Sequence, residues 1–224
     1  QNKILSYQDI FSMDRTNSST NIETGTSVGY GAEYNINKKN LQNEVYLDAG
    51  FSMGQVLKKS RLKEMPKNSS LQEKRSDYVG NASFKVISEK FNSGQFDINY
   101  NYILNKNFNA FLKNEITTSL SNNNNNLSLS YYEENKVGSK HYVETKYQRE
   151  FKDNLSFAMG LRKNLEEDFT ERNFIETNYE SDCLKIGLAL SKIFYQDEEL
   201  KPSNNLTFSI VLKPFGSPVA PDLS

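Results

Sequence analysis

Few residues of this chain have the types and spacing that chemistry requires. His141 is the single histidine, and no serine and carboxylate stand at a recognisable distance from it to form a hydrolase triad. A histidine metal site needs a second ligand, and a cysteine-rich zinc site needs several thiols, whereas Cys183 is the single cysteine. We therefore expect no catalytic residue, no metal site and no cofactor, and we interpret His141 as a packing residue near a membrane interface.

Adjacent acidic residues could suggest carboxylate chemistry. A glycosidase needs two carboxylates at a fixed separation on either side of a sugar cleft, and the sequence gives no sign of such a cleft. Carboxylates could also hold divalent cations that bridge lipid phosphates, but a solvated loop is the simpler interpretation. The pairs in question are Glu133–Glu134, Glu166–Glu167 and Glu198–Glu199.

The elements that would position these residues are β-strands. Apolar and polar residues alternate along almost the whole chain, which gives each strand one apolar and one polar face. We count about eleven such runs of roughly ten residues and no helical period. A clear example alternates Leu184, Ile186, Leu188 and Leu190 with Lys185, Gly187, Ala189 and Ser191.

Composition narrows the class of protein. The chain has 224 residues with a net charge of −1, which gives no electrostatic basis for binding nucleic acid. Its 14 Phe and 13 Tyr argue against disorder, and no segment approaches the roughly 20 apolar residues of a spanning helix. Soluble sandwiches use strands of about five or six residues, whereas membrane barrels use about nine to eleven. The pattern predicts an all-β protein, an antiparallel transmembrane β-barrel whose apolar face meets outer-membrane lipid.

Connection lengths predict the orientation and the domain organisation. The long connections 55–76 and 196–203 fall on one side, which we expect to be extracellular, and the tight turns 151–154 and 181–182 fall on the periplasmic side. Residues 1–23 lack alternation and are interpreted as the remnant of an extracellular loop, residues 24–213 as strands, and residues 214–224 as a periplasmic tail. An odd number of strands with two open edges predicts the C-terminal portion of a larger, incomplete barrel.

Two stretches resemble a known family. The first is the segment with Asp14 and Arg15 followed by GTSVGYGAEY from Gly25, and the second is NYESDCLKIGLALSKIFYQDEELKPSNNLTFSIVLKPFG from Asn178 to Gly216. Both are similar to the lipopolysaccharide (LPS) assembly outer-membrane protein LptD. The second contains a Tyr-Glu-x-x-Cys turn, a penultimate strand, a charged loop and a last strand that ends in Lys-Pro-x-Gly.

The resemblance implies a function without covalent chemistry. It implies transport of LPS into the outer leaflet of a Gram-negative outer membrane, with a plug lipoprotein of the LptE type and a periplasmic bridge of the LptA type as partners. LPS would leave beside the last strand, where the lateral-gate residues would be Leu206, Phe208, Ile210 and Leu212.

The resemblance also implies a disulfide between the barrel and a periplasmic domain. The family carries a pair of cysteines at the turn that contains Cys183, but Asp182 replaces the first of them here, so one such bond could form.

A porin-like or other outer-membrane channel is the alternative function. It fits the alternating strands equally well but leaves the C-terminal motif unexplained. Basic residues on the polar face agree with either function, because they could contact lipid phosphate or line a wet lumen. They are Lys85, Lys113, Lys146, Arg162 and Lys185.

Overall fold

The computed structural model describes residues 5–13, 15, 23–39, 45–63, 65, 70–88, 94–136, 140–151, 154–194 and 202–212. These ranges contain one short 3₁₀ helix and eleven strands, and no helix among them is long and apolar enough to cross a membrane. The elements are η1 (Gln8–Phe11), β1 (Ser27–Lys39), β2 (Val45–Lys58), β3 (Tyr78–Ser88), β4 (Gly94–Leu104), β5 (Phe111–Ser121), β6 (Asn125–Glu134), β7 (Lys140–Glu150), β8 (Leu155–Asn164), β9 (Phe169–Glu180), β10 (Leu184–Ile193) and β11 (Ser203–Leu212).

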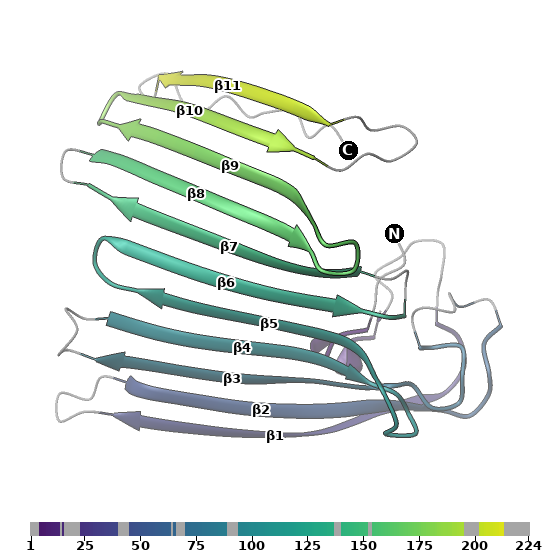
Figure 1. The fold of residues 1–224 in the computed structure, drawn as a ribbon. Coiled ribbons are helices and arrows are strands. Elements are labelled where there is room, and N and C mark those ends of the chain that lie inside the picture. Colours follow the sequence, from purple (N-terminus) through teal and green to yellow (C-terminus); the bar gives the residue numbers. More distant parts are fainter. Residues whose placement is uncertain are drawn as a thin grey trace. The chain divides into compact units, whose positions relative to one another are not determined.

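The strands form one antiparallel sheet in which spatial order follows chain order (Figure 1). Strands β1 and β11 stand at the two ends of this order, and each pairs on one side only within the described residues. The sheet is therefore open. This confirms the prediction of an all-β, antiparallel and incomplete barrel.

Two strand boundaries differ from the predicted ones. Residues 55–58, predicted to begin a loop, belong to β2, because they pair with residues 27–30 of β1 and the returning loop bonds to their other side. The backbone N–H of Ser76 donates to the carbonyl of Val56 at 2.9 Å, and Leu57 bridges Arg75. Ser203, predicted to end the connection 196–203, begins the last strand, which is observed at Ser203–Leu212; Lys213, the predicted end of the strands, lies outside the described residues.

Asparagine side chains build several of the turns. Asn122 Oδ1 accepts the backbone N–H groups of Asn124 and Asn125, and Asn164 Oδ1 accepts those of Glu166 and Glu167. These bonds replace backbone partners within a tight turn, which explains why asparagine occurs there. The Asn122–Asn126 run thus forms the β5–β6 turn and the beginning of β6.

The chain divides into two compact units. The first contains residues 1–119 and 130–141, and the second contains residues 120–129 and 142–224. In the first unit, the apolar face carries Val28, Tyr34 and Phe51, and the polar face carries the residues between them, such as Gly29 and Gly31.

The polar face of the first unit is covered near the loop that joins β2 to β3. A core forms there from strand residues and from two segments that fold over them, namely η1 with its preceding residues and the described parts of the β2–β3 loop, residues 59–63, 65 and 70–77. Its buried members are Leu5, Ile10, Val56, Met65, Leu71, Val79 and Ile103. The polar face of the first unit is therefore dry at this end, because Val56, Val79 and Ile103 occupy polar-face positions and are buried.

Close approach to glycines lets η1 lie flat on β1 and β2. A Cβ atom at Gly29 would stand 2.4 Å from the backbone oxygen of Ile10, and one at Gly54 would stand 2.8 Å from the end of the Ile10 side chain. Only a residue without a side chain fits beneath this helix. Residues 1–23 were interpreted from the sequence as a loop remnant, and their described part includes the packed helix η1.

In the second unit, β7 to β11 pair consecutively with matched apolar positions. Leu188 lies opposite Thr177 of β9 and Phe208 of β11, and Leu190 lies opposite Ile175 and Leu206. The apolar side chains among them are exposed on one face of the sheet. A broad face of exposed apolar residues is expected where lipid replaces water.

Candidate functional site

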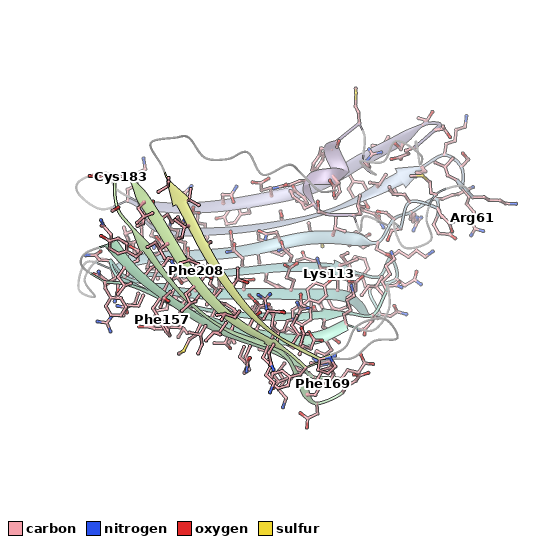
Figure 2. All side chains as sticks on the ribbon, turned by 90° about the horizontal axis from the view of Figure 1, so that it is seen from above. Arg61, Lys113, Phe157, Phe169, Cys183 and Phe208 are labelled. Carbon is pink, nitrogen blue, oxygen red and sulfur yellow. The ribbon has the colours of Figure 1, made fainter. Side chains whose placement is uncertain are left out.

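The predicted lateral-gate residues all lie on β11, the strand at the edge of the sheet. Leu206, Phe208, Ile210 and Leu212 share one face by alternation and are between 52% and 68% exposed. They lie opposite Leu190, Leu188, Ile186 and Leu184 of β10 respectively. Figure 2 shows Phe208 on this strand. Within the described residues, the outer edge of β11 therefore presents backbone donors and acceptors that pair with no strand, and this edge lies beside an apolar face.

Cys183 lies in the short turn between β9 and β10, at the end of those strands (Figure 2). Its thiol is exposed and forms no disulfide within the described residues. The turn is closed by the backbone N–H of Ser181, which donates to the carbonyl of Leu184 at 2.8 Å. The thiol is therefore accessible to a partner on the turn side of the second unit.

His141 contacts an aromatic residue in the first unit. Its Nε2 lies 3.0 Å from the hydroxyl of Tyr131, and the two rings meet edge to face at 5.4 Å between centroids. The Tyr131 hydroxyl donates to Glu133 at 3.2 Å, and the Asn114 amide donates to the same carboxylate oxygen at 3.0 Å. The imidazole thus bonds a phenol rather than a nucleophilic serine, so these contacts form no catalytic triad.

Three of the five basic residues named from the sequence enter local ion pairs. Lys113 pairs with Glu115 at 2.8 Å, Arg162 with Glu171 at 2.9 Å, and Lys185 with Glu180 at 3.5 Å. In the described part of the chain no three histidine, cysteine or acidic side chains converge as metal ligands would. The pair Glu198–Glu199 lies outside the described residues.

A polar pocket of about 530 Å³ opens on the polar face of the first unit beside η1. It is lined mainly by side chains that form hydrogen bonds, which include Glu33, Ser52, Asn81, Asn101, Lys113 and Glu115. Asn81 donates to Asn101 at 2.8 Å across β3 and β4. Such a surface suits water or a polar partner, as expected for the inside of a barrel.

Arg15 holds the segment that covers this pocket. Its Nε donates to the carbonyl of Ile10 at 2.9 Å, and one terminal nitrogen contacts both oxygens of Glu23 and the hydroxyl of Ser27, each at 2.9 Å. One side chain therefore joins η1, the approach to β1, and β1 itself. Sequence reasoning noted Arg15 only as part of a family motif, and Asp14 beside it lies outside the described residues.

Glu23 also pairs with a buried lysine at the end of β2. Lys58 Nζ lies 3.2 Å from Glu23 and donates to the carbonyl of Leu71 at 2.6 Å. Burial raises the pKa of the Glu23 carboxyl, but the hydrogen bond from Arg15 and the charges of Lys58 and Arg15 outweigh it, so this pKa lies below its ordinary value. Nothing in the sequence pattern indicated this pair, because its members are far apart along the chain.

A second ion pair joins the loops of the first unit. The ammonium of Lys136 contacts Asp77 and the hydroxyl of Ser70, and the other oxygen of Asp77 accepts the backbone N–H of Lys106 at 3.2 Å. The connections that follow β2, β4 and β6 are thus fastened to one another at one end of the sheet.

The fold and these surfaces define a class of protein. A one-sided antiparallel sheet of long strands, with a polar pocket on one face and exposed apolar residues on the other, is the architecture of a membrane β-barrel wall. The family model for LptD, LPS transport system D, matches residues 3–163, which is well over half of the sequence. The chain belongs to this family and has a role in LPS transport or assembly.

The matched region includes Arg15 and the GTSVGYGAEY stretch but ends before the C-terminal stretch from Asn178. No curated protein matches the sequence.

Proposed function

We propose that this chain forms part of the barrel wall of an LPS translocon, which delivers LPS to the outer leaflet of the outer membrane. The carrying observation is the match to the LptD family over residues 3–163. The sheet supports it physically, because one face suits lipid and the pocketed face suits saccharide or protein.

The loops fastened by Asp77 and Lys136 belong to the extracellular end in this proposal, and the tight turn with Cys183 belongs to the periplasmic end. The described segment 5–13 then covers the polar face from the extracellular side, while the predicted periplasmic tail, residues 214–224, lies outside the described residues. The polar pocket of the first unit suits contacts with a plug lipoprotein of the LptE type, and a periplasmic bridge of the LptA type would supply LPS to a domain outside this chain.

The open edge of β11 is the proposed exit. Backbone groups without partners cost several kcal/mol each in hydrocarbon, so this edge pairs with another strand when the path is closed. Parting of that pair would let an acyl chain pass from the lumen to the apolar face at Leu206, Phe208, Ile210 and Leu212. The opening requires no covalent step.

The test asks whether LPS contacts β11 during transport in living cells. A photo-crosslinking residue placed at Phe208 in the full-length protein should form an adduct with LPS while transport proceeds, and depletion of the protein should reduce surface LPS. The same residue at Leu155, on the exposed apolar surface of β8, is the control for contact with bulk lipid. Equal LPS adducts at both positions, or unchanged surface LPS after depletion, would contradict the proposal.

A further inference from the structure

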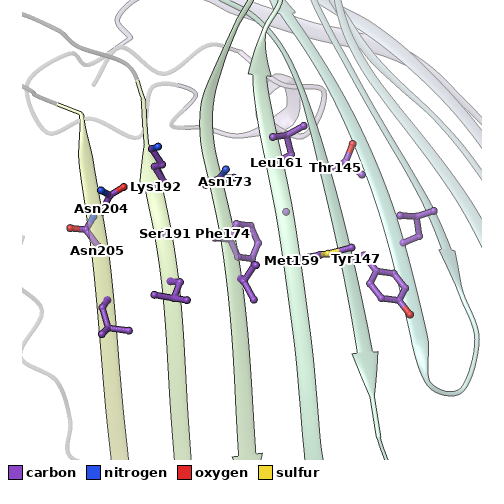
Figure 3. Close-up of a pocket in the computed structure, with 15 residues that line it drawn as sticks. Thr145, Tyr147, Met159, Leu161, Asn173, Phe174, Ser191, Lys192, Asn204 and Asn205 are labelled. Carbon is purple, nitrogen blue, oxygen red and sulfur yellow. The ribbon is translucent and has the colours of Figure 1, made fainter.

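The apolar face of the second unit contains a groove of about 990 Å³ (Figure 3). Its floor is a row of side chains paired across four adjacent strands: Met159 with Ile175, Ile175 with Leu190, and Leu190 with Leu206. All four are exposed, and no charged residue belongs to this row. A volume of this size suits a small amphiphile or one acyl chain with its neighbouring headgroup.

The next row toward the β8–β9 and β10–β11 connections has different chemistry. Lys192 lies directly opposite Asn173 on one side and Asn204 on the other, and all three line the groove (Figure 3). Residues two apart on a strand share a face and stand about 7 Å from each other. The groove thus changes from fully apolar at Leu190 to cationic and polar at Lys192 within one step along β10.

These polar groups are available for a ligand. Within the described residues, neither the ammonium of Lys192 nor the side-chain amides of Asn173 and Asn204 form a hydrogen bond or an ion pair with a protein group. The ammonium lies 4.6 Å from the centre of the Phe194 ring, a contact that leaves its N–H donors free. Lys163, by contrast, is paired with Asp168.

The occupant that fits is an anionic lipid. An acyl chain covers the apolar floor, and a phosphate at its polar end meets one ammonium and two amides, which are donors suited to phosphate oxygens. A peptide segment would need partners for its own backbone groups, and the floor consists of apolar side chains that offer none.

We propose that this groove binds a phosphate-bearing lipid, with its acyl chain across Met159, Ile175, Leu190 and Leu206 and its phosphate at Lys192, Asn173 and Asn204. The assignment of this lipid to the outer leaflet rests on the proposed function, because only that function orients the sheet. The site would then be the first place that a lipid leaving beside β11 occupies. The binding itself requires no transport.

The experiment measures retention of a defined probe by the full-length protein, purified and stripped of lipid. Native mass spectrometry would compare a diacyl phosphatidic acid with the diacylglycerol of the same chains. The wild-type protein should retain the phosphorylated probe about tenfold more strongly, as a charge-assisted contact of about 1.4 kcal/mol would give. Lys192→Gln should abolish this preference, and the matched control Lys163→Gln should keep it.

A second pair of variants tests the floor. Leu190→Trp fills the groove and should reduce retention of both probes, whereas Leu184→Trp, on the same face of β10 but away from the groove, should leave retention unchanged. If Leu190→Trp does not fold, a photoreactive acyl chain on the wild-type protein answers the same question, with adducts expected on the strand segments that contain Leu190 and Leu206.

Two results would overturn the site. One is a preference for phosphate that survives Lys192→Gln, and the other is adducts spread evenly over the apolar face, which would indicate annular lipid only. Either result leaves the transport proposal standing, since that is judged by surface LPS after depletion. Conversely, if surface LPS is unchanged after depletion while the protein still prefers the phosphorylated probe, the transport proposal is rejected and the lipid site stands.

Discussion

Lys58 Nζ lies 3.2 Å from a carboxylate oxygen of Glu23, and both side chains are almost completely removed from solvent. With Arg15 on the other side of the carboxylate, one negative charge holds two positive charges that belong to different segments. Removal of one partner from a buried pair leaves an uncompensated charge, which typically costs about 3–5 kcal/mol. The segment that covers the polar face is therefore fastened by Glu23.

Acid should loosen this segment. The folded pKa of Glu23 lies below its unfolded value of about 4.3, so the carboxylate stabilises the folded segment fully above that value. This contribution is lost as the pH falls through the lower, folded pKa. The protection of the Ile10 and Ser12 amides against exchange, relative to their intrinsic rates at each pH, should fall in that range, because their N–H groups bond within the η1 turn.

Glu23→Gln should produce the loosened state at neutral pH. We expect exchange at Ile10 and Ser12 to rise about a hundredfold, which corresponds to about 3 kcal/mol, and to lose its acid dependence. Asp168→Asn removes an exposed carboxylate whose pKa is lowered by the hydrogen bond and charge of Lys163, and it should leave this exchange unchanged. Equal exchange rates in Glu23→Gln and the wild type would show that the charge does not fasten the segment.

Gly29→Ala should displace η1. The added Cβ would approach the backbone oxygen of Ile10 to 2.4 Å, and a backbone atom moves only with its whole segment. Protease cleavage within residues 5–13 should become faster. Gly187→Ala is the matched control on β10, because its Cβ would meet only the movable ends of Ser209 and Asn178. Cleavage at the wild-type rate in Gly29→Ala would contradict this packing.

Leu188→Arg should destabilise the protein in a bilayer by about 2–4 kcal/mol if Leu188 lies near the midplane. Ala189→Arg, one residue further along β10 and on the opposite face, should be milder because that side chain enters the polar interior. Urea unfolding in lipid vesicles measures both. If Ala189→Arg destabilises the protein more than Leu188→Arg does, the assignment of the lipid-facing and lumen-facing sides of the sheet must be reversed.

Cys183 should form a disulfide with a periplasmic domain of the full-length protein. In the proposed orientation this turn faces the periplasm, where thiols encounter an oxidising environment, and the Cys183 thiol is exposed. Protein extracted under thiol-blocking conditions should change its gel mobility on reduction, and Cys183→Ser should remove the change. Identical mobility of the wild-type protein with and without reductant would leave Cys183 a free thiol.

The strands were predictable because each carries its own local signal. Alternation along Leu184–Leu190 fixes which side chains share a face, and the pairing of Leu188 with Phe208 follows once the two strands are neighbours. The β5–β6 turn is local in the same way, since the side chain of Asn122 bonds to backbone groups two and three residues away.

The covered end of the polar face was not predictable in this way. Ile10 is buried because Gly29 and Gly54 come together beneath it, and these three residues are separated along the chain. The partners of Arg15 were hidden for the same reason, although its place in a family motif was visible. The row of polar residues around Lys192 was not predictable for the same reason, because Asn173 and Asn204 lie opposite Lys192 only once their three strands pair.

The sequential strand order has a consequence for how the sheet is built. Because each strand pairs with its neighbour in the sequence, every pairing closes only a short loop and costs little chain entropy. The hairpins can therefore be added one after another, each new strand covering the edge of the last. Joining β11 to a strand far away in the sequence would be the one pairing without this advantage. We expect it to be the slowest to form and the easiest to reopen.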